Sequence, residues 1–170
     1  MMRLFKKKED CGTLQVDDQS IVAIADGRMI DIAAVPDDVF AQQMMGTSTA
    51  FAFSQDEVTL SSPANGILSV LFPTGHAYGI TMKDGSELLV HIGIDTVQAN
   101  GDGFTILKHQ GDCVKAGDPI VTVNLKKLRK KFDMSVMLIV VKKGMQEINF
   151  AKPCAVERGQ NILDSQLKAA

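Results

Sequence analysis

Short apolar runs separated by turn-forming residues fill most of this sequence, and this alternation limits the fold more than any other feature does. Asp26-Gly27, Asn65-Gly66 and Asp84-Gly85 each stand between two such runs. Asn-Gly and Asp-Gly between apolar runs are typical of β-hairpin turns. The runs that we expect to form strands lie within residues 21–25, 29–32, 58–60, 67–72, 76–82, 87–92, 120–123 and 136–141.

Helical patterns are short by comparison. Residues 35–40 are predicted to open a short helix, because Pro36 stands near its first position and acidic residues occupy its first turn. Phe40 and Met44 then follow one turn apart. Residues 125–132 are predicted to add one or two further turns. We therefore predict an all-β protein, an antiparallel β-sandwich or barrel-sandwich with a few short helical turns.

The chain has the length of one domain, with 170 residues. We place this domain at residues 19–165, after a polar lead-in at 1–18 and before a short tail at 166–170. The net charge of −2 gives no electrostatic basis for binding nucleic acid. Since no apolar run approaches the roughly 20 residues of a membrane helix, we expect no insertion into a membrane. The cysteines, which form no CxxC motif and favour a reducing cytoplasmic location, are Cys11, Cys113 and Cys154.

Two of the three histidines, His76 and His91, lie in the last of the predicted hairpins. With a loop at residues 82–85, Thr81 faces Ser86, and the same register places His76 directly opposite His91 on one face. A shift of one residue would move the two rings to opposite faces. The pair suits a nucleophilic imidazole with a second imidazole as its hydrogen-bond partner, or a metal site. Two half-exposed strand histidines without a role are an equally simple interpretation.

The strand that carries His91 belongs to a longer pattern. Residues 87–97 read Glu-Leu-Leu-Val-His-Ile-Gly-Ile-Asp-Thr-Val, and Gly101-Asp102-Gly103-Phe104 follows them. Four further phrases complete the pattern: Val35-Pro36-Asp37-Asp38-Val39-Phe40, Ser62-Pro63-Ala64-Asn65-Gly66, Thr74-Gly75-His76-Ala77 and residues 111–120. Over about residues 20–163, this combination resembles the glucose-type IIA domain of the bacterial phosphoenolpyruvate-dependent sugar phosphotransferase system.

The resemblance implies that the chain is a phosphoryl carrier. His91 matches the histidine that accepts a phosphoryl group from the phosphocarrier protein HPr and passes it to the IIB domain of a membrane sugar permease. His76 matches the second active-site histidine, which stabilises the phosphoryl group, and Thr74 is placed to orient His76. No cofactor is required, because phosphoryl transfer depends mainly on positioning and charge stabilisation. The phosphorylation state of such a protein can also signal sugar supply to regulatory targets.

Both partners must dock over the histidines, so the resemblance also implies an apolar rim with a few charges. The apolar candidates, each of which could equally be a core residue, are Phe40, Met44, Met45, Phe72 and Leu89. Asp37 and Asp95 are candidates to meet basic residues of HPr, although either could be an ordinary turn or cap residue. His109 lies in a polar stretch and is given no role.

Other functions remain open on the residues alone. A lipoyl- or biotinyl-type carrier module has a similar sandwich with a lysine at a hairpin tip, where this chain has Lys83 followed by Asp84. A lysostaphin-like zinc peptidase would use the H-x-x-x-D ligands that His91 and Asp95 match, but no H-x-H follows to complete its site. A zinc ion shared between His76, His91 and a partner's carboxylate, and a purely regulatory role, also stay open.

Overall fold

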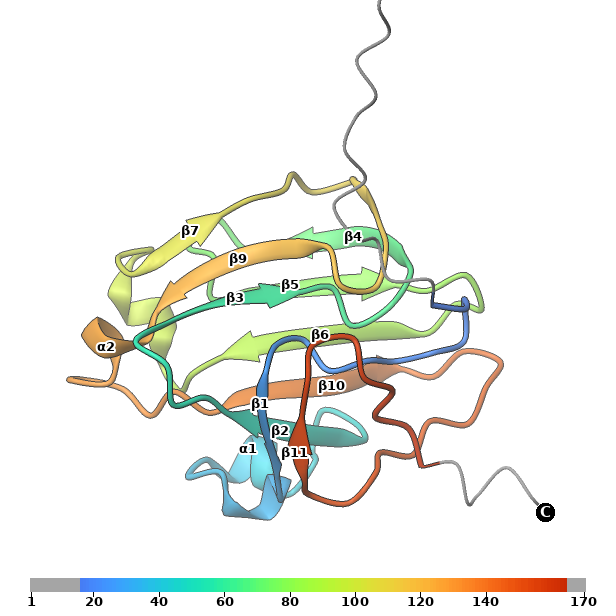
Figure 1. Cartoon of the computed structure of the whole chain (residues 1–170), viewed down its shortest axis with the longest axis horizontal. Coiled ribbons are helices and arrows are strands. Elements are labelled where there is room, and N and C mark those ends of the chain that lie inside the picture. Colours follow the sequence, from blue (N-terminus) through green and yellow to red (C-terminus); the bar gives the residue numbers. More distant parts are fainter. Residues whose placement is uncertain (1–15, 165–170) are drawn as a thin grey trace, which may run out of the picture.

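The computed structural model describes residues 16–164, which form two antiparallel sheets with an apolar core between them (Figure 1). The larger sheet has eight strands in the order β11-β1-β2-β10-β6-β5-β4-β8, and the smaller has three in the order β3-β9-β7. The strands are β1 (Gly27–Ile30), β2 (Ser48–Ala52), β3 (Glu57–Ser61), β4 (Gly66–Leu71), β5 (Ala77–Thr81), β6 (Glu87–Ile92), β7 (Phe104–Ile106), β8 (Cys113–Val114), β9 (Pro119–Asn124), β10 (Val136–Lys142) and β11 (Ala155–Val156). The predicted antiparallel all-β fold is confirmed.

Side chains from both sheets meet in the main core. Leu60 of β3 and Val121 of β9 belong to the same buried cluster as Leu68 of β4 and Tyr78 of β5. The fully buried Tyr78 hydroxyl donates a hydrogen bond of 2.8 Å to the Ser61 carbonyl. The polar group of this large side chain is therefore satisfied inside the core, and it links the two sheets.

The larger sheet is also covered on its outer face. A second apolar cluster lies there, and its buried members are Ile32, Val35, Phe40, Ala50, Met137 and Ile139. Along β10, Val136 and Leu138 belong to the main core, whereas Met137 and Ile139 belong to this second cluster. Because β10 is buried on both faces, its sequence is an uninterrupted apolar run instead of an alternating one.

Only one of the three predicted turns closes a hairpin. Gly85, with a φ of +90°, ends the turn between β5 and β6, which are paired neighbours. Asp26-Gly27 leads into β1, which pairs with β2 and β11, and Asn65-Gly66 connects β3 of one sheet to β4 of the other. The hairpins predicted at these two turns are therefore wrong. A turn reverses the chain locally, but the partner of a strand is chosen by long-range burial.

The first short helix begins later than the sequence predicts. A 3-10 turn, η1 (Ile32–Ala34), precedes α1 (Asp38–Ala41), and Asp37 is the N-cap that accepts a hydrogen bond of 2.9 Å from the Val39 amide. Pro36 precedes the N-cap Asp37 and lies outside the helix, so it does not occupy the first helical position near which the sequence predicts it. The remaining helical segments are η2 (Thr96–Ala99) and α2 (Leu125–Leu128), which covers the first half of the helix predicted at residues 125–132.

The segment at residues 21–25 is buried throughout, but it is not a strand, since only Val22 forms an isolated bridge, with Asn161.

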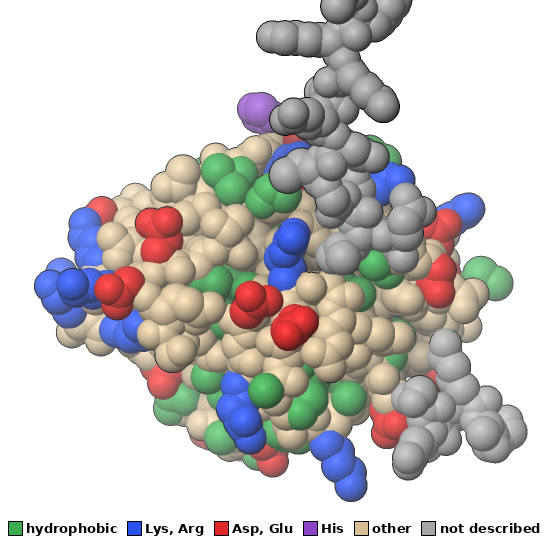
Figure 2. Space-filling model, viewed as in Figure 1, with side chains coloured by type: hydrophobic (Ala, Val, Ile, Leu, Met, Phe, Trp, Pro, Cys, Tyr) green, Lys and Arg blue, Asp and Glu red, His purple; other side chains and the backbone are tan. Residues whose placement is uncertain are grey.

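Most of the predicted lead-in (residues 1–15) and the tail at 166–170 lie outside the described residues. Between residues 16 and 164, no helix is long and apolar enough to cross a membrane. On the face shown in Figure 2, basic and acidic side chains are interspersed, in keeping with the net charge of −2.

Candidate functional site

The two histidines meet at one end of the β5–β6 hairpin, although not in the predicted register. His91 of β6 pairs with Ala77, and the turn consists of residues 83–85, closed by a hydrogen bond of 2.8 Å from the Met82 amide to the Ser86 carbonyl. The prediction that His76 stands directly opposite His91 is therefore wrong by one residue. The rings still meet, because His76 lies before the first residue of β5, in a bend that follows Gly75, whose φ is +76°.

The His91 ring is fixed by the backbone that follows it. Its Nδ1 lies 2.9 Å from the Gly93 carbonyl oxygen. A carbonyl can only accept, so Nδ1 carries the proton and Nε2 carries the lone pair of the neutral ring. Gly93 has a φ of +74°, and a Cβ there would lie 2.5 Å from Thr96 Cγ2. Gly93 thus sets the tautomer of His91, a role that the sequence interpretation missed.

The His76 ring is held by a side chain. Thr74 Oγ1 lies 2.5 Å from His76 Nδ1, in agreement with the predicted contact between these residues. His76 is only 6% exposed. Gly75, between them, has a φ of +76°, which strains a larger residue, and an added Cβ would make a tight contact of 3.0 Å with Phe104 Cβ. The turn before β5 therefore places Thr74 and His76 so that the hydroxyl contacts the imidazole.

Aromatic and imidazole rings surround the pair. The His76 and His91 ring centroids are 5.4 Å apart in an edge-to-face arrangement, with an interplanar angle of 81°. Phe40 of α1 lies 4.9 Å from the His91 ring, and Phe72 lies 5.1 Å from the His76 ring. The two imidazoles are thus each packed against a phenyl ring and against each other, which restricts how far either can rotate.

Both histidines are kept in the neutral form. Burial lowers the pKa of His76. Burial is also the largest cause that lowers the pKa of His91, followed by the neighbouring His76, while the Gly93 carbonyl, Asp37 and Asp95 partly oppose it. The neutral imidazole is the form that can act as a nucleophile at neutral pH.

A shallow hollow of about 230 Å³ opens beside His91. The structure brings both predicted acidic residues to it, Asp37 from the cap of α1 and Asp95 from the cap of η2. Val39 and Val97 also line it and are 44% and 51% exposed. These two valines were missed by the sequence interpretation. The helical spacing of α1 could have found Val39, because it turns away from the buried Phe40.

The predicted apolar rim is divided by the structure. Phe72 is exposed beside His76, as a rim residue should be, and Phe40 contacts His91 from within the second apolar cluster. Leu89 is half-buried against that same cluster. Met44 and Met45 are exposed after α1, and neither lines the hollow beside His91.

Metal ligands are sparse around the pair. Within residues 16–164, no group of three or more His, Cys, Asp or Glu side chains is placed to hold a metal ion, so the histidines supply two ligands at most. His109 lies away from the pair and beside Asp112, at 3.9 Å. Cys113 and Cys154 are free thiols, and Cys11 lies outside the described residues.

Comparison with known proteins shows which proteins the chain is similar to. The family model described as the phosphoenolpyruvate-dependent sugar phosphotransferase system, EIIA 1, matches residues 19–147. The PTS system glucose-specific EIIA component of Staphylococcus aureus (strain COL) is 38% identical over 159 residues, 92% of this chain and 95% of that protein. A glucoside-specific EIICBA component of Staphylococcus carnosus is 35% identical over 144 residues, 84% of this chain and 20% of that protein.

A solved structure agrees with the same assignment. The glucose permease IIA from Mycoplasma capricolum superimposes with a TM-score of 0.79 at 35% identity, covering 85% of this chain and 93% of that one. At 35% identity, the similarity between the two proteins covers the sequence as well as the fold. The carrier-module and zinc-peptidase alternatives are thereby set aside. The chain belongs to the EIIA 1 family of the phosphoenolpyruvate-dependent sugar phosphotransferase system and is a phosphoryl-carrying component of that system.

Proposed function

We propose that His91 Nε2 accepts a phosphoryl group from a phosphohistidine of HPr and passes it to a cysteine of a permease IIB domain. The observation that carries this assignment is the hydrogen bond from His91 Nδ1 to the Gly93 carbonyl, which leaves the lone pair on Nε2. The relatives named above are glucose- and glucoside-specific. We therefore propose a sugar of this class for the permease, and a cytoplasmic location for the relay.

Acceptance is a direct displacement at phosphorus. The Nε2 lone pair forms the new N–P bond, and the electron pair of the broken N–P bond leaves with the donor imidazole, protonated on its other nitrogen and released neutral. The positive charge passes to the His91 ring. Its Nδ1 keeps its proton and continues to donate a hydrogen bond to the Gly93 carbonyl. Asp37 and Asp95 favour the charged His91 ring electrostatically, so they lower the energy of this product.

In donation to IIB, the Nε2–P bond that formed during acceptance is broken. A cysteine thiolate of IIB attacks phosphorus, and the electrons of the Nε2–P bond return to His91, which becomes neutral again. His76 assists if Thr74 donates to its Nδ1, because the proton of the neutral ring then lies on Nε2. That N–H can donate to a phosphoryl oxygen during transfer.

The surface around the histidines supports docking by two partners in turn. Val39, Val97 and Phe72 present exposed apolar surface, and Asp37 and Asp95 place negative charge beside it. Basic residues of HPr would meet these carboxylates. The reaction requires no cofactor, and a zinc ion could join His76 and His91 only with a ligand added by a partner.

The experiment is phosphorylation by phosphoenolpyruvate, Enzyme I and HPr. We expect an acid-labile, base-stable phosphate on the protein and none on His91→Ala, with an unchanged fold, because the truncated side chain is half-buried. His109→Ala is the matched control, since that side chain is 95% exposed and far from the site, and it should be phosphorylated normally. Phosphorylation of His91→Ala at the normal rate would refute the assignment.

A further inference from the structure

An apolar groove of about 450 Å³ lies at the other end of the β5–β6 hairpin, away from the histidines. Ile67, Met82 and Val114 line it, and Ile67 is 42% exposed. Cys113, also exposed, lines the groove and pairs with Ile67 across β4 and β8. The phosphoryl chemistry uses none of these residues.

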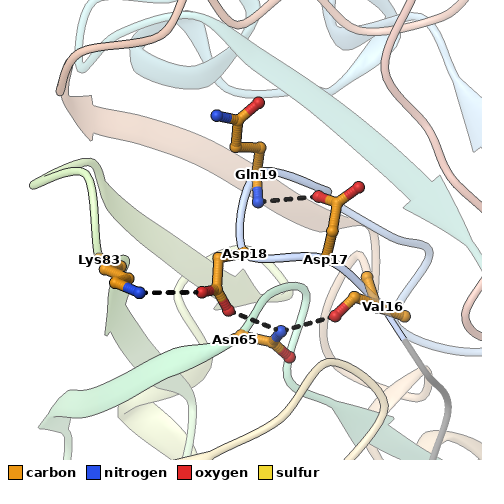
Figure 3. Close-up of polar contacts among 6 residues, drawn as sticks. All are labelled: Val16, Asp17, Asp18, Gln19, Asn65 and Lys83. Carbon is orange, nitrogen blue, oxygen red and sulfur yellow. Dashed lines mark hydrogen bonds and ion pairs between the residues drawn. The ribbon is translucent and has the colours of Figure 1, made fainter.

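The chain enters the described structure at the rim of this groove (Figure 3). The Asn65 amide donates to the Val16 carbonyl at 2.8 Å and to the Asp18 carboxylate at 3.1 Å. Lys83 pairs with the same carboxylate at 3.4 Å. Asn65 also accepts a hydrogen bond of 2.9 Å from the Ala116 amide, and Ala116 follows Cys113 by three residues. The Asn65 side chain thus connects Val16 to the segment that carries Cys113. These contacts fix the point from which residues 1–15 must start.

We propose that the segment preceding Val16 docks in this groove, with Leu14 against Ile67. Leu14 is two residues before Val16 in the sequence, and Cys11 is five before it. At about 3.4 Å per residue, the five residues from Val16 back to Cys11 can span at most about 17 Å, and we propose that this length brings Cys11 to Cys113. Docking would remove the exposed part of Ile67 from water.

The native cysteines provide the measurement. In a glutathione redox buffer, a Cys11–Cys113 disulfide forms by two thiol–disulfide exchanges, which oxidise the two protein thiols and reduce one oxidised glutathione to two thiols. The equilibrium constant for forming this disulfide yields the effective concentration of Cys11 at Cys113. It is measured in the Cys154→Ser background, so that only this pair can form within one chain.

Two matched variants separate docking from simple tethering. Ile67 and Val70 both lie on β4 and are 42% and 40% exposed, but only Ile67 lines the groove. Ile67→Asn and Leu14→Asn should each lower the effective concentration about fivefold or more, whereas Val70→Asn should leave it within about twofold. An unchanged value in Ile67→Asn, or disulfides that join two chains, would overturn the proposal.

Phosphoryl acceptance should be the same in Ile67→Asn, Val70→Asn and Leu14→Asn, because the groove and the histidines lie at opposite ends of the hairpin. The docking proposal does not rest on the proposed function. A failure of phosphorylation with normal disulfide formation would count against the role of His91 alone, and the reverse result would count against docking alone.

Discussion

The two ends of the β5–β6 hairpin share one ladder but differ in how far their polar groups are satisfied. At the turn end, the Asp84 carboxylate accepts hydrogen bonds from the Ser86 amide (2.9 Å), the Ser86 hydroxyl (3.0 Å) and the Gln146 amide (3.2 Å). Burial alone would raise the pKa of Asp84, but these hydrogen bonds outweigh it and lower the pKa. At the turn end, the Asp84 carboxylate thus finds its hydrogen-bond partners within the protein.

At the histidine end, the protein holds each imidazole by one nitrogen only. Thr74 contacts His76 Nδ1 and the Gly93 carbonyl accepts from His91 Nδ1, while neither Nε2 has a hydrogen-bond partner within residues 16–164. A polar atom that the fold positions but leaves unpaired is available to an incoming group. The comparison teaches that the ladder positions polar groups at both ends, and that reactivity resides where a hydrogen-bonding position stays open.

The largest expected effect is on transfer out of the histidine end. His76→Gln keeps a side chain that can hydrogen-bond but cannot become a cation. Donation to IIB should slow about 100-fold, because His76 acts on the phosphoryl charge as the His91–P bond breaks, while acceptance from HPr should change much less. Rapid-quench measurement of acceptance from HPr and of donation to IIB, each by itself, tests this expectation. Equal donation rates for wild type and variant would show that His76 is a bystander.

Gly93→Ala should weaken both properties that the comparison separates. The positive φ and the 2.5 Å approach to Thr96 force the backbone to move, so we expect a loss of about 1–3 kcal/mol in unfolding free energy. Acceptance should slow about 10-fold, because the carbonyl that holds His91 Nδ1 moves with it. Nitrogen chemical shifts of the imidazole would report the tautomer. A normal tautomer with slow acceptance would contradict this explanation.

Asp84→Asn should affect stability alone. Removing charged hydrogen bonds in a half-exposed turn should lower the unfolding free energy by about 1 kcal/mol, with phosphoryl acceptance unchanged. The lowered pKa means that this stabilisation is present above the unfolded value of 3.8 and is lost as the pH falls through the folded pKa. Urea unfolding between neutral and acidic pH should therefore show a smaller acid sensitivity in the variant. A slower acceptance rate would break the separation of the two ends.

Thr74→Val tests whether the histidine end needs the orientation of His76 or only its presence. The variant keeps the shape of the side chain and removes the hydroxyl that contacts Nδ1. Donation should slow a few-fold, less than in His76→Gln, because the ring remains packed against Phe72. A reduction as large as that of His76→Gln would mean that orientation accounts for the whole contribution of His76.

The smallest effect is the pH dependence of stability at His91. Its lowered folded pKa means that the unfolded chain binds the proton more readily, so stability is complete above 6.5 and falls as the pH drops from 6.5 toward the folded value. The His91→Gln variant should have a smaller slope and keep the part that His76 contributes, since burial lowers the pKa of His76 as well. The midpoint of acceptance against pH should also lie below 6.5, and a midpoint above 6.5 would contradict the effect of burial.

Much of this protein is readable from local sequence. Asp-Gly and Asn-Gly turns, strand-length apolar runs and a lack of helical periodicity predict the antiparallel β fold, because these are properties of near neighbours in the chain. The phrases around His76 and His91 predict the family, and the resemblance to that family predicts the contact between the Thr74 hydroxyl and the His76 imidazole.

Tertiary structure decided what depends on distant residues. The register of β5 against β6 and the separation of β3 from β4 follow from burial across two sheets, so two predicted hairpins and the direct pairing of the histidines were wrong. The reactive nitrogen of His91 is fixed by a carbonyl whose position depends on the left-handed backbone of Gly93 and on the segment packed against it. Turn type is a local quantity, whereas strand register and tautomer are set by contacts that exist only once the sheets have closed on their core.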